Sequence, residues 1–305
     1  MSQATGIVRL LRLPLCVTAV VDVLAGYLVA LAPNLGQASW RTMALLAGTS
    51  AGLYLFGMVQ NDVVDVRRDR ALKVPRPLVT GEVGWGAAIA FLVGTALLAA
   101  VCMAYLPPAA ILPAVAAFGV INLYNLGAKG GPAYIAMTTM GACRLLNYAI
   151  GVTAAIGIPH IWYYKWQFLT PAGPLWVRHA LALFFVTAMI SGYSLSARRG
   201  YTVSTRPWQI VFIVVLLEGF GLMALSHVDF GKVFGHGNFD GIYISPLVAR
   251  LFALLVLPVL WPGGLWSAMG TERKPQEYGR FIERTIYWMM LLDVAFVVDA
   301  VWMRT

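Results

Sequence analysis

The stretch Asn61-Asp62-Val63-Val64-Asp65-Val66-Arg67-Arg68-Asp69-Arg70 holds three of the 13 acidic residues of a 305-residue chain. It follows a long apolar run, so we expect it to continue a helix. At about 100° per residue, the oxygen-bearing side chains of this stretch then fall within one quadrant of the helix. Crowded carboxylates repel one another unless a cation neutralises them. The members of this face, called the acidic face below, are Asn61, Asp62, Asp65 and Asp69.

A set of oxygen ligands favours Mg²⁺ or Mn²⁺ over zinc. Protein-bound Mg²⁺ usually keeps one or two carboxylates and completes its shell with water and substrate phosphates, so we expect a diphosphate as the partner. The residues that follow suit a phosphate because Arg70, Lys73 and Arg76 supply donors, and Arg binds phosphate oxygens with two hydrogen bonds. The alternative is that these basic residues only set membrane topology.

The composition around this stretch is that of a polytopic membrane protein. Hydrophobic residues make up 60% of the chain and charged residues 11%, against about 25% charged in ordinary soluble domains. This balance excludes a secreted disulfide scaffold, a disordered regulator and an ordinary DNA-binding domain, and we expect no nucleic-acid partner. A window of about 19 residues predicts nine spans. They lie near 13–32, 42–60, 86–106, 109–127, 132–156, 179–197, 208–226, 246–267 and 284–303.

The net charge of +9 is explained mostly by topology. With nine spans, 15 Lys and Arg residues fall in the loops of one side and 5 in those of the other. The positive-inside rule then predicts a cytoplasmic N-terminus, in a multi-pass protein of the inner (plasma) membrane.

The acidic face, with Arg70, the segment 75–78 and Gly81, resembles the first aspartate-rich motif of the UbiA superfamily of intramembrane prenyltransferases. The segment 124–129, which ends the fourth span with Lys129, is similar to the Tyr/Lys connection of that family. Within the family, Thr18-Ala19 with Asp22 and 24–26, and the segment 141–147, resemble the EboC-like branch associated with the eboshi clusters.

The resemblance covers nearly the whole chain and implies a single integral-membrane domain over 1–305. Its fold would be all-α, a bundle of nine transmembrane helices with a central cavity open toward the cytoplasmic side. Its activity would be Mg²⁺-dependent transfer of an isoprenoid group from a prenyl diphosphate to a lipid or aromatic acceptor among the membrane lipids. A dry cavity would protect the allylic cation from water.

The sequence departs from the family at the second aspartate motif, which is expected at the cytoplasmic end of the sixth span. The segment 191–201 has no acidic residue, and neither has the whole interval 83–217. Arg198 and Arg199 could replace the second metal with fixed positive charge. Alternatively, the protein could be an isoprenoid-diphosphate cyclase or use an unusual acceptor, or it could be a non-catalytic lipid carrier or transporter.

Ionisable groups at bilayer depth point to function. Arg144 and Asn147 lie one turn apart on the fifth span, where we expect them to face the cavity, with Asp22 as a charge partner for Arg144. The alternative is an interhelical clamp that only fixes packing.

The predicted site has three overlapping sets of residues. The catalytic set is Asp62, Asp65, Asp69, Arg144 and Asn147, and the metal ligands are Asn61, Asp62, Asp65 and Asp69. The substrate-binding set is Asn61, Arg70, Arg76, Lys129, Tyr193, Arg198 and Arg199.

Overall fold

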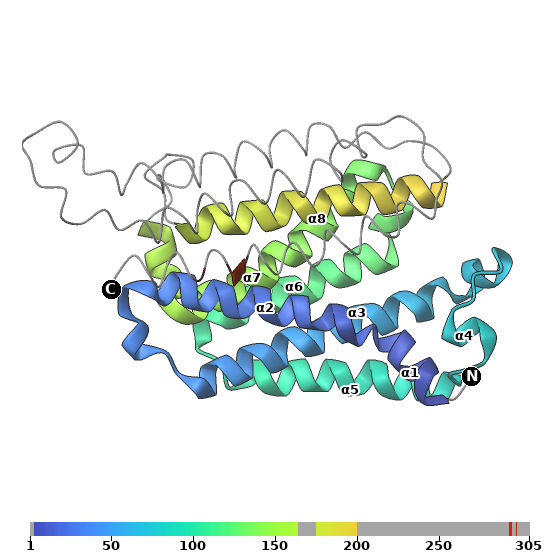
Figure 1. Cartoon of the computed structure of the whole chain (residues 1–305), viewed down its shortest axis with the longest axis horizontal. Coiled ribbons are helices and arrows are strands. Elements are labelled where there is room, and N and C mark those ends of the chain that lie inside the picture. Colours follow the sequence, from blue (N-terminus) through green and yellow to red (C-terminus); the bar gives the residue numbers. More distant parts are fainter. Residues whose placement is uncertain (1–2, 164–174, 200–292, 295–296, 298–305) are drawn as a thin grey trace, which may run out of the picture.

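The computed structural model describes residues 3–163, 175–199, 293–294 and 297, and this part of the chain is all helical. Figure 1 shows the long helices running side by side along one axis. The long helices are α2 (Leu13–Leu31), α3 (Trp40–Ala71), α5 (Trp85–Ala104), α6 (Pro108–Leu126), α7 (Ala133–Tyr163) and α8 (Leu175–Arg199). The short ones are α1 (Gln3–Leu11), η1 (Ala32–Gln37), α4 (Pro77–Thr80) and η2 (Ala128–Gly130).

Five of the described helical stretches are long and apolar enough to cross a membrane, so the chain is a multi-pass membrane protein. They span Thr5–Leu31, Trp40–Ala71, Trp85–Ala104, Pro108–Leu126 and Ala133–Pro159. On α5, Val93, Leu97 and Val101 are exposed by half or more. A stripe of exposed apolar side chains on a helix is compatible with lipid and would be unfavourable in water.

The first six predicted spans correspond to helices, and the largest difference is at the second. We predicted its end at residue 60, but α3 continues to Ala71. The charged stretch therefore belongs to the same helix as the apolar run, as expected for the acidic face. The last three predicted spans, 208–226, 246–267 and 284–303, lie outside the described residues, apart from the helical residues 293–294 and 297.

Small residues bring α2 and α7 into close contact. A Cβ added at Gly26 would meet the backbone carbonyl of Tyr148, and one added at Gly151 would meet the backbone of Val23 and Tyr27. Helix pairs inside membranes are held in this way because small residues let the two backbones approach. The α2–α7 contact is therefore a rigid centre of the bundle.

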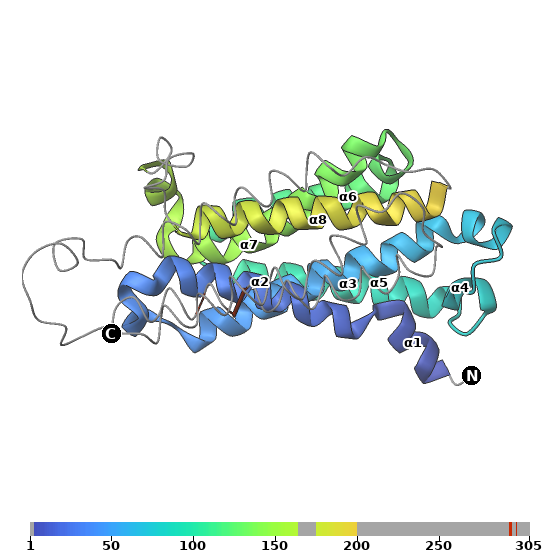
Figure 2. The ribbon, with the colours of Figure 1, turned by 45° about the horizontal axis from the view of Figure 1, so that its top comes forward.

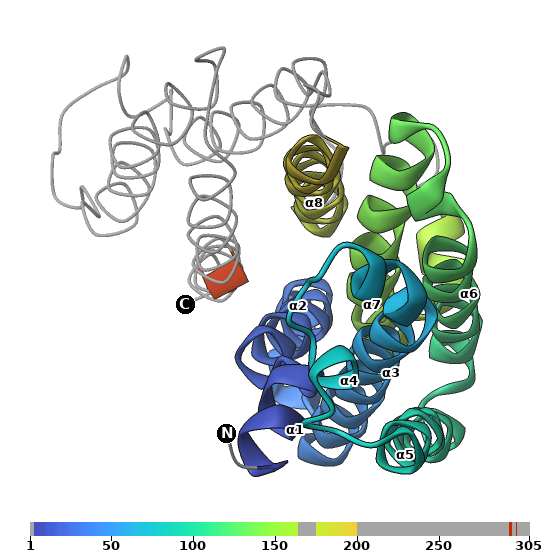
Figure 3. The same ribbon diagram turned by 90° about the vertical axis from the view of Figure 1, so that its right-hand side faces the viewer.

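The other helices are arranged around this pair. Helix α3 packs between α2 and α5, while α6 and α8 both pack on α7. The end-on view in Figure 3 shows α5 at the margin of this arrangement and α8 on the opposite margin. The charged end of α3, the connection through α4 and the end of α8 lie toward the same end of the bundle (Figure 2). Polar groups from several helices thus meet at that end.

Candidate functional site

The acidic face lies at the C-terminal end of α3 and is buried. Asn61, Asp62, Asp65 and Asp69 keep exposed fractions of only 6%, 2%, 8% and 6%. Buried carboxylates are stable only when they are paired or bind a cation. The side chains around them supply that charge.

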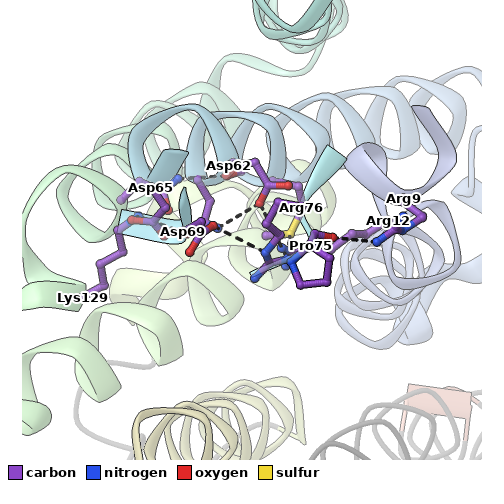
Figure 4. A network of polar contacts seen from close by, with 12 residues as sticks. Arg9, Arg12, Asp62, Asp65, Asp69, Pro75, Arg76 and Lys129 are labelled. Atoms are coloured by element: carbon purple, nitrogen blue, oxygen red, sulfur yellow. Dashed lines mark hydrogen bonds and ion pairs between the residues drawn. The ribbon is translucent and has the colours of Figure 1, made fainter. Parts of the chain in front are cut away.

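Two arginines from outside α3 contact Asp62 and Asp69 (Figure 4). An Nη2 atom of Arg12 lies 3.1 Å from Oδ1 of Asp62. Arg76, just before α4, lies between two carboxylates, with Nη1 3.9 Å from Asp62 Oδ1 and Nε 3.6 Å from Asp69 Oδ2. Positive charge therefore lines the side of the acidic face that a bound anion would approach.

Lys129, on η2, contacts the other two members of the acidic face, Asp65 and Asn61. Its ammonium group lies 2.9 Å from Oδ1 of Asp65 and donates to Oδ1 of Asn61 at 3.1 Å. The Lys129 side chain is 7% exposed, so its ion pair with Asp65 lies in a low-dielectric environment away from water. The predicted motif residues at the ends of the second and fourth spans thus meet in space.

The α3 helix is held in place by an amide cluster with α6. Asn125 donates to the carbonyl of Gly57 at 3.0 Å and to Oε1 of Gln60 at 2.9 Å, while Gln60 donates to Asn122 at 2.7 Å. Because the cluster lies one turn before Asn61, it positions the acidic face relative to Lys129.

The connection after α3 is tied to α1. Arg9 makes two hydrogen bonds to Glu82, at 2.9 and 3.0 Å, and a third to the carbonyl of Pro75 at 2.8 Å. Gly81 ends α4 in the left-handed conformation, with φ of 76°. This tie fixes the backbone next to Arg76.

The acidic face fits an oxygen-liganded cation. Oδ2 of Asp62 and Oδ2 of Asp69 are buried with no hydrogen-bond partner among the described residues. In that part of the chain, no three His, Cys, Asp or Glu side chains are close enough together to hold a metal by themselves. A bound Mg²⁺ would accordingly need water and phosphate oxygens to complete its shell, which is its usual mode of binding.

A cavity of about 300 Å³ lies inside the bundle next to the acidic face, of which Asn61 is part of the lining. Its walls come from α2, α3, α6, α7 and α8, and they are mainly apolar. Asn61 and Arg12 line one part, and Arg144 and Asn147 line another. Further lining residues are Leu15, Leu53, Tyr54, Met58, Ile121, Tyr124, Met140, Cys143, Thr187, Ile190, Ser191 and Ser194.

Arg144 and Asn147 line this cavity and also join α7 to α2. Arg144 lies 2.7 Å from Oδ2 of Asp22 and donates to Thr18 at 2.8 Å, while Asn147 donates to the carbonyl of Ala19 at 2.8 Å. The predicted pairing of Arg144 with Asp22 is confirmed. The sequence left two alternatives for Arg144 and Asn147, which were lining the cavity and clamping two helices together. In the structure, both residues have both roles.

The remaining predicted residues are less closely associated with the acidic face. Arg70 is exposed on α3, about 100° around the helix from Asp69. Tyr193, Arg198 and Arg199 belong to α8, but their side chains lie outside the described part of the structure.

Arg12 is the contact that sequence reasoning missed, because Arg12 was used only to infer topology. It occupies the break between α1 and α2 with φ of 48°, a conformation rare for residues other than glycine. The available signal was an arginine directly before an apolar span, a feature shared by many membrane proteins.

Solved structures share this architecture. No protein-family model matches the sequence, and a comparison with curated proteins finds no match. A UbiA homologue from Aeropyrum pernix K1 superposes with a TM-score of 0.60 at 15% identity, over 94% of this chain and 98% of that one. A UbiA homologue from Archaeoglobus fulgidus, bound to DMAPP and Mg²⁺, does so with a TM-score of 0.54 at 18% identity, over 97% and 98%. The chain has the UbiA fold.

A digeranylgeranylglyceryl phosphate synthase gives a TM-score of 0.61 at 17% identity, over 99% of this chain and 100% of that one. At these identities the likeness shows the UbiA fold alone. Any activity of this chain has to be argued from its own side chains.

Proposed function

We propose that this chain is a Mg²⁺-dependent, UbiA-type membrane prenyltransferase that moves an isoprenoid group from a prenyl diphosphate to an acceptor. The observation that carries the proposal is the buried acidic face, ringed by Arg12, Arg76 and Lys129 at the end of an apolar cavity. The DMAPP and Mg²⁺ bound to the Archaeoglobus fulgidus homologue support the choice of donor and metal.

In this proposal Asn61, Asp62, Asp65 and Asp69 hold Mg²⁺ together with the diphosphate. Bound Mg²⁺ would neutralise part of the diphosphate charge and make it a better leaving group. Arg12, Arg76 and Lys129 turn their N–H groups from the carboxylates to the phosphate oxygens, where charge develops as the C–O bond breaks. The apolar walls of the cavity enclose the prenyl chain and exclude water from the allylic cation.

Arg198 and Arg199 are proposed to supply the positive charge that a second metal would otherwise bring. The interval 83–217 contains no carboxylate, so no residue between α5 and α8 provides a second acidic motif. A guanidinium group matches the geometry of phosphate oxygens and remains charged.

The finer features of the resemblance are also part of the proposal. They are a single domain over 1–305, nine spans, membership of the EboC-like branch and a cavity open to the cytoplasm. The N-terminus is cytoplasmic in the inner membrane, because the basic loops then lie on the cytoplasmic side.

The test is Mg²⁺-dependent binding of GPP to the purified full chain. Asp62→Ala or Asp65→Ala is expected to abolish the Mg²⁺-dependent part of binding, because each removes an oxygen ligand and leaves a neighbouring cation without its partner. Arg67→Ala is the control, since Arg67 lies on the same helix as the acidic face but is exposed. Unchanged binding in the aspartate variants would refute the metal assignment.

Release of diphosphate from GPP then distinguishes a transferase from a cyclase and from a carrier. A transferase releases diphosphate only with an acceptor and yields a prenylated product, whereas a cyclase releases it without one. A carrier binds GPP and releases none.

A further inference from the structure

Two residues of α8 that line the cavity carry a buried hydroxyl group without a hydrogen bond among the described residues. Ser191 is 4% exposed, and its Oγ atom is buried with no hydrogen bond among the described residues. The buried Oγ1 atom of Thr187, one turn earlier, is in the same state. Both residues line the cavity. Buried polar groups are nearly always satisfied, so an unsatisfied pair at a cavity wall indicates a ligand.

Thr49 and Tyr148 also have a buried hydroxyl without a hydrogen bond among the described residues, but neither lines the cavity. Three other buried threonines satisfy their hydroxyls within their own helix. Thr95, Thr139 and Thr153 each donate to the carbonyl four residues earlier, at 2.7, 2.7 and 2.8 Å. Such back-bonding is the usual way for a helical Ser or Thr to satisfy its hydroxyl. Thr187 and Ser191 share this helical setting without making the bond, so a small side-chain rotation could turn their unpaired hydroxyls to a ligand in the cavity that they line.

The position of Ser191 along the bundle suits an acceptor. Its neighbours Ala188 and Leu195 on α8 pack in one cluster with Tyr124 of α6 and Met137 of α7. Tyr124 precedes Asn125, which is bonded to α3 one turn before the acidic face. Ser191 also lines the same cavity as Asn61, a member of the acidic face. The reacting carbon of a prenyl diphosphate would lie there.

The charges of the residues that line the cavity limit the kind of acceptor it can bind. Arg12 and Arg144 are the charged residues among the described lining, and each is paired with an aspartate outside the lining. Arg144 is compensated by Asp22, which has 0% exposure. No uncompensated cation therefore remains in the described deeper wall to attract an anionic acceptor.

We propose that Thr187 and Ser191 bind the hydroxyl group of an uncharged acceptor. This inference rests on the proposed function. The acceptor oxygen bonds to the first prenyl carbon of the allylic cation, after the bond from that carbon to the diphosphate has broken. The bonding pair leaves on the diphosphate, which also takes the hydroxyl proton. No further co-reactant is required.

The test measures binding of matched probes to the full chain loaded with Mg²⁺ and a non-reacting thiolo analogue of GPP. One pair is 4-hydroxyphenylethanol and 4-hydroxyphenylacetate, and the other is 1-O-octylglycerol and its phosphate ester. The neutral member of each pair is expected to bind at least about tenfold more tightly. Thr187→Val with Ser191→Ala should weaken neutral binding by about three- to tenfold, the effect of losing one or two neutral hydrogen bonds.

Two further variants make the result specific. Thr139→Val removes a hydroxyl that is satisfied within α7 and should leave probe binding unchanged. Asp22→Asn leaves Arg144 without its counter-charge and should shift preference toward the anionic probes.

Three results would overturn the inference: preference of wild-type protein for the anionic probes, equal neutral binding by the hydroxyl double variant, or binding of neither probe. Failure of the wild-type protein to bind the GPP analogue itself would instead refute the proposed function.

Discussion

At the scale of single residues, Arg12 combines a rare backbone conformation with a functional contact. A residue other than glycine in the left-handed region costs on the order of 1 kcal/mol, and such residues persist where the surroundings hold them. The contact of Arg12 with Asp62, at 3.1 Å, accounts for the direction of its side chain. At the break between α1 and α2, this guanidinium therefore lies against the acidic face.

Replacing Arg12 by glycine should separate its backbone role from its charge. Arg12→Gly is expected to weaken Mg²⁺-dependent GPP binding by about 10- to 100-fold, the range for losing a hydrogen bond to a charged group. Glycine adopts the positive φ without strain, so any fall in the melting temperature should come from the lost ion pair with the buried Asp62 and not from the backbone. Titration of GPP measures the effect, with the exposed Arg67→Ala as control. Wild-type affinity in Arg12→Gly would exclude Arg12 from the donor site.

At the scale of elements, the site depends on the distance between α2 and α7, because Arg12 directly precedes α2 and Arg144 lies on α7. Their close approach follows from Gly26 and Gly151. The prediction of helices here came directly from the apolar runs. The predicted end of the second span was wrong because a hydropathy average over 19 residues falls at the first charged residues. The helix itself continues, since its charged groups find partners.

A methyl group at Gly151 should separate the two helices. Gly151→Ala is expected to lower the free energy of unfolding by about 1–3 kcal/mol, since the new Cβ meets the backbone of α2. Gly94→Ala is the matched control, because nothing lies within 4 Å of a Cβ there and alanine favours the helix. Thermal unfolding in detergent compares the two variants. Equal behaviour would contradict the tight α2–α7 contact.

At the scale of the whole molecule, the acidic face on α3 is contacted from the break between α1 and α2, from η2 and from the connection before α4. Ligand binding there should therefore stabilise the bundle. Mg²⁺ and GPP together, at about 100 times their Kd, are expected to add about 2.7 kcal/mol of stability. Mg²⁺ or GPP alone should add much less, because each needs the other to complete its contacts. A thermal melt in detergent reads the shift, and a chelator should reverse it. Equal stabilisation by GPP with the chelator present would mean that no metal takes part.

The sequence alone determined the features that depend on neighbours along the chain. Apolar runs require membrane helices, and the spacing of Asn61, Asp62, Asp65 and Asp69 requires one face, because both follow from helical periodicity. The tertiary structure decided which cations meet that face, that Arg144 is neutralised by Asp22, and that two α8 residues with unpaired hydroxyls line the cavity. These contacts join residues far apart in the chain, and their partners are set by helix packing, which leaves no local pattern in the sequence.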